Sequence, residues 1–247
     1  MNGKTVAIIQ ARMSSTRLPG KVLKPLGNLP SIVFMVQRVR LAQTCDEVCV
    51  ATSVDATDDA LADALQQHDI PVFRGPLDDV LARYIQAADS LNADVVLRLT
   101  GDCPLIDPNI LDRVVRMREK YDLDYASNVE PPTYPDGLNV ETAKRAALDY
   151  AYQHARGKSD REHVTPVLRR NDRKELRIRN MSAMVDLSHL RWTVDHQADY
   201  EHVAAIVSHL GPNAVQSDMF DCLRAVEEAQ LTDAGSLYRR NEAYRPD

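Results

Sequence analysis

The sequence contains no run of apolar residues that approaches the roughly 20 residues a membrane-spanning helix requires. The apolar run nearest the N-terminus, Val6 to Ile9, is too short to form the core of a secretory signal peptide. We therefore expect a cytoplasmic protein with no membrane partner.

An excess of basic charge is also lacking. The 247 residues include 30 Lys and Arg against 36 Asp and Glu, which gives a formal net charge of -6. Because a broad basic field drives nonspecific binding to nucleic acid, we expect no nucleic-acid partner. A small anionic ligand is still compatible with this composition, because a local basic loop can lie on an acidic protein.

Cysteine is scarce, and the spacings typical of metal sites are missing. The four cysteines form no CxxC pair and no dense framework, which argues against a disulfide scaffold. His202 and His209 could share one face of a helix, but no third ligand at zinc spacing accompanies them. We therefore expect no structural zinc.

The first half of the sequence alternates between patterns typical of strands and of helices. The predicted strands are Thr5 to Gln10, Glu47 to Thr52, Pro71 to Phe73 and Asp94 to Leu99. The predicted helices between and after them are Ser31 to Gln43, a segment capped by Thr57, Asp78 to Leu91 and a segment capped by Asp107. This alternation predicts a mainly parallel, Rossmann-like sheet with helices on both faces.

The second half is less regular. Glu130 to Gly137 holds three prolines and a glycine, which indicates a loop or a boundary. Further helices are predicted at Ala143 to His154, Asp160 to Arg170 and Gln197 to Leu210, and strands at Leu176 to Arg179 and Arg191 to Val194. We expect a single domain over residues 1–247 with a small lobe at about 128–170.

The loop after the first strand, Gln10 to Leu23, concentrates charge and hydroxyl groups. It contains Arg12, Ser15, Arg17 and Lys21 within a dozen residues. Ligands of parallel α/β sheets bind beyond the carboxyl ends of the strands, so this loop is placed to bind an anion. It lacks the GxxxxGK[ST] pattern of a Walker A loop. An exposed basic loop without a ligand is the alternative interpretation.

Two aspartates follow predicted strands. Asp102 comes after Gly101 at the end of one buried strand, and Asp195 ends another. Carboxylates in such places can hold Mg²⁺ together with substrate phosphates. A turn aspartate that accepts hydrogen bonds from its own backbone is the alternative for Asp102.

Five sequence blocks resemble the cytidylyltransferases that activate acidic keto-sugars. ARMSSTRLPGKVL, TGDCPLIDP and TVDHQADYE are similar to blocks of the 3-deoxy-manno-octulosonate and acylneuraminate enzymes. YPDGLNVE and SDREHVTP resemble the spore-coat polysaccharide SpsF-like branch. The blocks run from Ala11 to Glu201 in the order of that family, and their ordered combination is more specific than any one of them.

The resemblance implies a fold, a reaction and a cofactor. The fold is a three-layer α/β/α nucleotidyltransferase with an inserted dimerisation or acceptor lobe. The reaction joins the hydroxyl of a sugar acid to the α-phosphorus of CTP, releases pyrophosphate and requires Mg²⁺, in polysaccharide or glycoconjugate biosynthesis. The resemblance also implies a homodimer formed through an arm in the middle of the chain.

The resemblance further implies roles for individual residues. Arg12, Lys21 and Asp102 would be catalytic, and Asp102 and Asp195 would hold the metal. The nucleotide-binding residues, which include two of the catalytic ones, would be Ala11, Arg12, Ser15, Arg17, Lys21, Arg74 and Gly101. The acceptor-binding residues would be Asn139, Glu141, Arg161 and His163. Arg161 is the candidate for pairing with the acceptor carboxylate.

Other functions remain open on the sequence. The same site could transfer a nucleotide other than CMP, or use an acceptor such as a phosphonate. The chain could also bind a nucleotide without turnover. A GT-A glycosyltransferase fits less well, because Asp102-Cys103-Pro104 is not the Asp-x-Asp metal motif of such enzymes.

Overall fold

The computed structural model describes residues 3–232, 238 and 240. A seven-stranded sheet with the order β5-β4-β1-β6-β8-β7-β9 forms its centre. The strands are β1 (Thr5–Gln10), β4 (Glu47–Ser53), β5 (Val72–Gly75), β6 (Val95–Thr100), β7 (Tyr125–Ser127), β8 (Glu141–Lys144) and β9 (Ile178–Asn180). A short hairpin lies outside this sheet and consists of β2 (Pro25–Leu26) and β3 (Leu29–Pro30).

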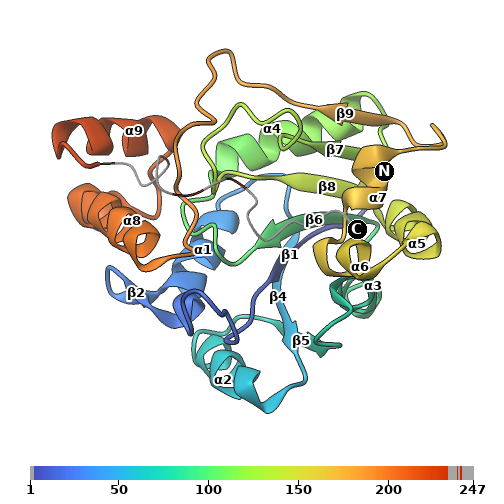
Figure 1. Cartoon of the computed structure of the whole chain (residues 1–247), viewed down its shortest axis with the longest axis horizontal. Helices are drawn as coiled ribbons and strands as arrows, with labels where there is room; N and C mark the ends of the chain where they lie inside the picture. Colours follow the sequence, from blue (N-terminus) through green and yellow to red (C-terminus); the bar gives the residue numbers. More distant parts are fainter. Residues whose placement is uncertain (1–2, 233–237, 239, 241–247) are drawn as a thin grey trace.

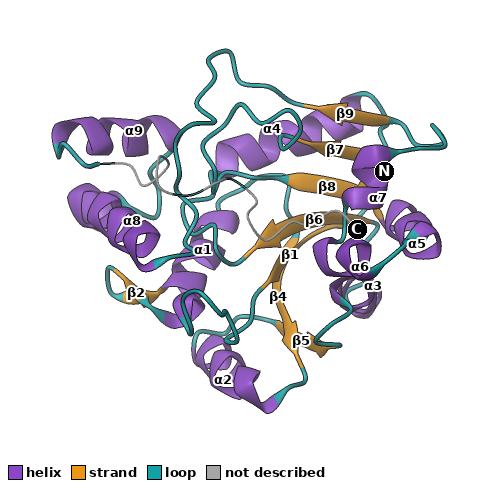
Figure 2. Cartoon of the chain, viewed as in Figure 1, coloured by secondary structure: helices purple, strands orange, loops and turns teal. Residues whose placement is uncertain are grey.

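Helices cover both faces of the sheet (Figures 1 and 2). One group comprises α1 (Ser31–Val39), α2 (Asp59–Gln67), α4 (Pro108–Lys120), α8 (Gln197–Leu210) and α9 (Met219–Glu228), whose buried residues share one core. In Figure 1, α8 and α9 lie at the left, α4 at the top and α2 at the bottom. The group on the right comprises α3 (Val80–Ser90), α5 (Arg145–His154), α6 (Lys158–His163) and α7 (Pro166–Arg170). The expected three-layer α/β/α arrangement is confirmed.

The pleat of β1 explains why there are two cores. Successive side chains of a strand point to opposite faces, so Ala7 and Ile9 pack with the first helix group and Val6 and Ile8 with the second. All four side chains are fully buried. A strand buried on both faces requires the uninterrupted apolar pattern by which β1 was predicted.

The order of the strands brings the important loops together. β1 lies between β4 and β6 and pairs in parallel with both, so that Gln10 is level with Ala51 and Thr100. β8 is antiparallel to β6 and to β7. The sheet is therefore mixed and mainly parallel, as expected, and the loops that follow β1 and β6 emerge side by side.

One predicted strand is wrong. Within Arg191 to Val194, only Arg191 forms a bridge, with Asp136. The backbone instead joins two loops, because Trp192 N–H donates to the Asp136 carbonyl at 2.6 Å and Val194 N–H to the Asp102 carbonyl at 2.7 Å. Asp195 consequently follows an extended connection and does not end a strand.

Several helix boundaries also differ from the predictions. The helix that begins at Ser31 ends at Val39, and the helix predicted over Asp160 to Arg170 is broken into α6 and α7. The break lies at Val164, whose φ of 70° a right-handed helix cannot accommodate. Thr57 is not a helix cap, because it belongs to a 3₁₀ turn capped by the side chain of Asp55.

The segment expected to form a lobe, 128–170, contributes β8 to the middle of the main sheet, while α5, α6 and α7 join the right-hand helix group. Its separation as a lobe stays a prediction. Among residues 3–232, 238 and 240, no helix is long and apolar enough to cross a membrane.

Candidate active site

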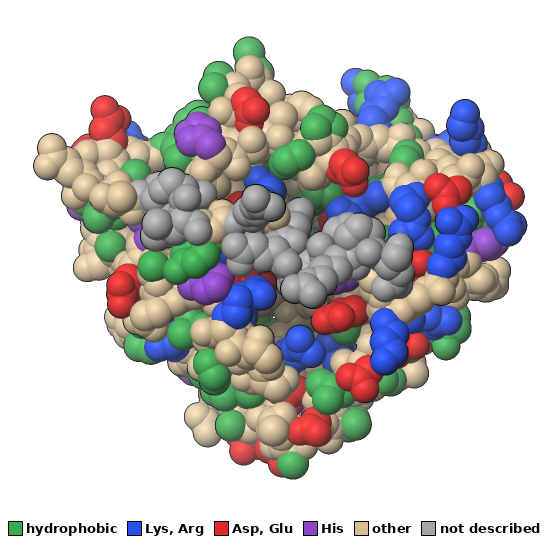
Figure 3. Space-filling view, viewed as in Figure 1, with side chains coloured by type: hydrophobic (Ala, Val, Ile, Leu, Met, Phe, Trp, Pro, Cys, Tyr) green, Lys and Arg blue, Asp and Glu red, His purple; other side chains and the backbone are tan. Residues whose placement is uncertain are grey.

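A cavity of about 290 Å³ opens beyond the carboxyl ends of β1 and β6. Its wall is strongly charged, and Figure 3 shows basic and acidic side chains gathered around the hollow near the centre of this face. The cations that line it are Arg12, Arg17, Lys21, Arg83, Arg98, Arg169 and Arg240, and the acids are Asp102, Asp136, Glu141, Glu162 and Asp195. Such a wall fits a polyanionic ligand with a bound cation.

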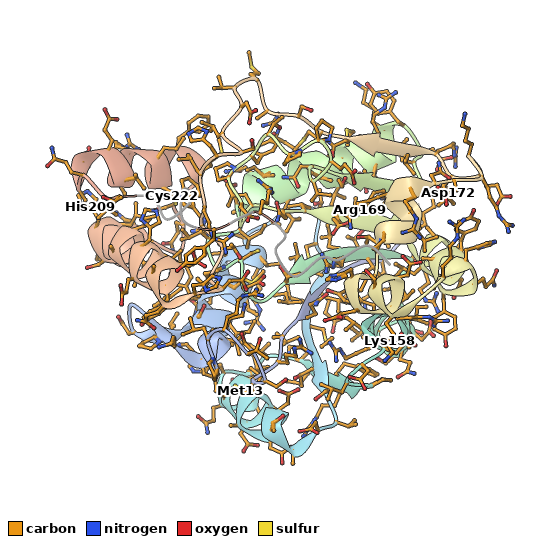
Figure 4. All side chains as sticks on the ribbon, in the orientation of Figure 1. Met13, Lys158, Arg169, Asp172, His209 and Cys222 are labelled. Carbon is orange, nitrogen blue, oxygen red and sulfur yellow. The ribbon has the colours of Figure 1, made fainter. Side chains whose placement is uncertain are left out.

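The loop after β1 is held in place by buried polar contacts. Met13 N–H donates to Asp58 Oδ1 at 2.7 Å, which ties the loop to the turn before α2, and Figure 4 labels Met13 beside that helix. Asp58 is fully buried and also accepts hydrogen bonds from the backbone and hydroxyl of Ser53. Gly20 closes the loop with a φ of 68°, a conformation that glycine adopts without strain. Arg12, Ser15 and Arg17 therefore extend from an ordered loop into the cavity.

Lys21 lies between the two aspartates that the sequence singled out. Its Nζ is 2.7 Å from Asp195 Oδ1 and 3.3 Å from Asp102 Oδ2. Burial tends to lower the pKa of Lys21, but the two carboxylates outweigh it and raise that pKa. Arg17 adds a second cation, with Nη2 at 2.9 Å from Asp195 Oδ1.

Asp102 is positioned by a close approach of two loops. Gly101 N–H donates to the Gln10 carbonyl at 2.8 Å, and a Cβ on Gly101 would lie only 3.0 Å from that of Ala11. Burial tends to raise the pKa of Asp102, but the charge of Lys21 and hydrogen bonds from Thr100 and Cys103 lower it to about 2. Asp102 therefore carries a negative charge at neutral pH.

Asp195 is fixed from behind by Asp199 and Arg191. Asp199, at the start of α8, is fully buried and accepts the backbone N–H groups of Asp195 and His196, each at 2.9 Å. Arg191 donates to both carboxylate oxygens of Asp199, at 2.9 and 3.1 Å. The carboxylate of Asp195 thus projects from a rigid support.

The geometry fits a divalent cation that shares its ligands with a substrate. One carboxylate oxygen of Asp102 and one of Asp195 both contact the ammonium group of Lys21. The position of that ammonium group is therefore one at which positive charge is stabilised. Among the described residues no group of three or more His, Cys, Asp or Glu could hold a metal. Two carboxylates completed by phosphate oxygens and water are typical of Mg²⁺.

The lining of the cavity also includes three of the four predicted acceptor residues, Asn139, Glu141 and His163. Glu141 is buried and paired with Arg98, with Nη1 to Oε1 at 2.8 Å. Burial tends to raise the pKa of Glu141, but Arg98 and Arg169 lower it. Burial lowers the pKa of His163, which keeps its imidazole neutral at pH 7.

Two predicted site residues are placed elsewhere. Arg161 does not line the cavity, and its guanidinium contacts Asp79 at 3.2 Å and stacks over the Tyr152 ring at 3.6 Å. Arg74 also lies outside the lining. It donates to the carbonyls of Ser53 and Asp55 and pairs with Asp59 at 2.7 Å. In this structure both arginines are engaged by neighbouring protein groups.

The cavity also contains charged residues that the sequence alone did not assign to the site. Arg98 was visible as the single charge in an apolar strand, and Asp136 lies within the YPDGLNVE block. Arg169 reaches the cavity from α7, where Figure 4 labels it. Arg83 comes from α3, and no pattern in the sequence pointed to Arg240.

The comparisons with known proteins identify the family of this chain. A family model described as Cytidylyltransferase matches residues 6–230. The spore coat polysaccharide biosynthesis protein SpsF of Bacillus subtilis (strain 168) is 33% identical over 236 residues, covering 90% of this chain and 95% of that protein. The 3-deoxy-manno-octulosonate cytidylyltransferase of Anaeromyxobacter sp. (strain Fw109-5) is 38% identical over 147 residues, 59% of this chain and 56% of that protein.

A solved structure is similar over nearly the whole chain. It is a cytidylyltransferase from Leptospira borgpetersenii serovar Hardjo-bovis (strain JB197), with a TM-score of 0.87 and 30% identity. The similarity covers 93% of this chain and 96% of that one. The residues matched by the family model include Lys21, Asp102 and Asp195.

Proposed function

This chain belongs to the cytidylyltransferase family and is a CTP-dependent nucleotidyltransferase, and from that premise we propose the reaction it catalyses. CMP is transferred from CTP to a hydroxyl of a keto-sugar acid of the nonulosonic or octulosonic type, in the presence of Mg²⁺. The new bond joins the acceptor oxygen to the α-phosphorus, and the bond from that phosphorus to the leaving pyrophosphate breaks. The product serves polysaccharide or glycoconjugate biosynthesis.

The observation that carries the proposal is the convergence of Lys21, Asp102 and Asp195 in one cavity. These residues are up to 174 positions apart in the chain, yet their charged atoms meet beyond the ends of β1 and β6. Transfer of a nucleotidyl group depends on positioning and on neutralising negative charge. An arrangement of one cation and two carboxylates directed at it meets both requirements.

The loop after β1 would bind the triphosphate. Arg12 and Arg17 are the more exposed cations of this loop, with 45% and 32% of their side chains accessible. Ser15 adds a hydroxyl, and the backbone at Ala11 and Gly101 lines the same wall. We assign Arg12, Ser15 and Lys21 to the phosphates, with Arg17 beside them.

Asp102 and Asp195 would hold the metal. When bound, Mg²⁺ supplies charge neutralisation on the phosphate oxygens, which favours departure of pyrophosphate. The chain's own part is to aim both carboxylates at one point. Arg191 and Asp199 do this for Asp195, and the approach of Gly101 to the β1 loop does it for Asp102.

The acceptor would occupy the end of the cavity near β8. Asn139 and His163 offer neutral polar groups there, and Arg98 and Arg169 offer positive charge for a carboxylate. Glu141 would act mainly by orienting Arg98, since the two side chains form a buried pair. Arg161 would need to leave Asp79 to take part, so we favour the two arginines that already line the cavity.

A direct test mixes the protein with CTP, Mg²⁺ and a panel of nonulosonic and octulosonic acids and measures pyrophosphate release. We expect release with at least one acid, and a loss of at least about 100-fold in Asp102→Asn, since even indirect partners of metal ligands contribute 10- to 100-fold. The matched control Asp69→Asn changes an exposed aspartate remote from the cavity. Full turnover in Asp102→Asn would refute the metal assignment.

The choice of nucleotide is tested separately. A triphosphate present at 100 times its dissociation constant stabilises the folded state by about 2.7 kcal/mol, which a thermal-shift measurement detects. We expect such a shift with CTP. A shift with GTP or UTP and none with CTP would overturn the assignment of the base. Light scattering on the same samples tests the homodimer that the family resemblance implies.

A further inference from the structure

The ammonium group of Lys21 occupies the point to which the two proposed metal ligands are directed. Only 11% of the Lys21 side chain is accessible, and Nζ contacts one carboxylate oxygen of Asp102 and one of Asp195. An ion bound to these two oxygens at about 2.0–2.1 Å would compete with the ammonium for the same partners. Lys21 and the metal therefore exclude each other at this point.

We infer that Lys21 is the resident cation of the metal-free site, and that a divalent ion and Lys21 exchange places when the nucleotide binds. The inference rests on the proposed function, since it takes Asp102 and Asp195 as metal ligands. The ion displaces the ammonium from the two carboxylates. The released ammonium then pairs with the triphosphate, which enters with the metal.

The supports of the three side chains favour movement of the lysine over movement of the aspartates. The backbone carbonyl of Asp102 accepts Val194 N–H and the Thr193 hydroxyl, and the backbone N–H of Asp195 is bound by Asp199. Lys21 has a flexible four-carbon side chain and starts a short 3₁₀ turn, η1 (Lys21–Leu23), directly after Gly20. The carboxylates stay in place while the ammonium swings.

This exchange makes metal and nucleotide binding cooperative. Without nucleotide, the ion must break two ion pairs and leave Lys21 with no new partner. Without metal, the triphosphate must draw Lys21 away from two carboxylates that are then left facing each other. When both ligands are present, the triphosphate gives Lys21 a new partner and the metal gives the two carboxylates a new cation. Each ligand therefore raises the affinity of the other by the same factor.

The first test measures Mn²⁺ alone, by calorimetry and by its electron paramagnetic resonance signal, with no nucleotide present. Lys21→Met removes the competing ammonium at nearly constant volume. We expect the affinity for Mn²⁺ to rise roughly 10- to 100-fold, the equivalent of one or two charged hydrogen bonds. Unchanged or weaker Mn²⁺ binding would overturn the exchange.

Arg17→Met is the matched control for that test. It removes one positive charge that contacts the same Asp195 oxygen, at 2.9 Å, whereas Lys21 contacts both carboxylates. We expect an increase of no more than a few-fold. An increase equal to that of Lys21→Met would show a general charge effect and would also overturn the exchange.

The second test measures CTP binding in EDTA. Asp195→Asn weakens the hold on Lys21, so metal-free CTP should bind about tenfold more tightly than to the unaltered protein. Asp69→Asn removes an exposed carboxylate that does not line the cavity, and should leave that affinity unchanged. Equal tightening in both variants, or none in Asp195→Asn, contradicts the exchange.

The outcomes separate this inference from the proposed function. If the unaltered protein binds CTP with a metal and releases pyrophosphate, yet Lys21→Met does not raise Mn²⁺ affinity, only the exchange is wrong. If no variant binds Mn²⁺ or CTP under any condition, the proposed function itself fails, and the exchange with it. Circular dichroism confirms in each case that the variant is folded.

Discussion

The ionisation of Asp102 connects the chemistry of the cavity to the stability of the fold. Its pKa is lowered from 3.8 to about 2, chiefly because the charge of Lys21 and nearby hydrogen bonds overcome the effect of burial. A carboxyl whose pKa is lower in the folded state stabilises the fold above the unfolded pKa. That contribution is lost as the pH falls through the folded pKa.

We therefore predict a pH-dependent difference between the unaltered protein and Asp102→Asn. Near pH 7 the variant should be less stable by about 2 kcal/mol, and about half of that difference should vanish by pH 3. Urea denaturation at several pH values measures it. The control Asp69→Asn, at an exposed site, should show a small difference that does not change in this way. A gap that stays constant down to pH 3 would contradict the lowered pKa.

The sequence predicted the key residues of the cavity better than it predicted the peripheral ones. Lys21 and Asp102 follow strands whose carboxyl ends must lie at one edge of a parallel sheet, so their meeting follows from topology. The side chains of Arg74 and Arg161, in contrast, point toward whichever acidic group lies nearest in the fold. Arg74 pairs with Asp59 and Arg161 with Asp79, and no local sequence pattern predicts these ion pairs.

At the scale of elements, the loop after β1 depends on the turn that precedes α2. Asp58 accepts Met13 N–H from that loop and two hydrogen bonds from Ser53, and it is fully buried. The loop after β1 and the end of β4 are thereby joined by one carboxylate. The turn thus supports that loop although it does not line the cavity.

We predict that Asp58→Ala loosens this loop. Leaving buried N–H groups unpaired should cost roughly 1–3 kcal/mol of unfolding free energy. CTP affinity should fall roughly tenfold, because apparent affinity scales with the fraction of loops in the binding conformation. Isothermal calorimetry and denaturant unfolding measure the two effects. Asp55→Ala, which removes an exposed turn cap nearby, should change CTP affinity little; an equal loss there would mean that Asp58 has no special role.

Elements made of continuous apolar runs were predicted well, and those shaped by polar contacts were not. β1 and β6 are buried on both faces, which their apolar runs require. Arg191 to Val194 is buried as well, but the N–H groups of Trp192 and Val194 bond to loop carbonyls at Asp136 and Asp102. A pattern of burial indicates which side chains are inside, and leaves open whether the backbone pairs with a strand or with a loop.

For the whole molecule, the position of β8 could not be anticipated. It enters the sheet antiparallel between β6 and β7, so that Glu141 faces Arg98 across the strand pair. The sequence offered an irregular segment with prolines and predicted a lobe there. Long-range pairing of this kind depends on the whole core, and no local signal specifies it.

A second long-range feature involves the last part of the chain that the structure describes. Residues 238 and 240 lie beyond the region matched by the family model, which ends at residue 230. Tyr238 stacks on the His196 ring at 3.9 Å, beside Asp195. Arg240 donates to Asn139 Oδ1 at 2.6 Å and to the Tyr134 carbonyl at 3.0 Å, at the acceptor end of the cavity.

We predict from these contacts that Arg240→Gln impairs use of the acceptor and leaves CTP binding intact. Arg240 is 17% accessible and lies 3.6 Å from Asp136, so its loss removes positive charge and a support for Asn139 together. The KM for the sugar acid should rise about tenfold, as expected for one charged hydrogen bond, with an unchanged Kd for CTP. The control Arg224→Gln removes an exposed arginine on α9 and should change neither quantity. A lower KM in Arg240→Gln would instead show that this arginine obstructs the acceptor, because removing an obstruction opens the site whereas removing a binding group weakens it.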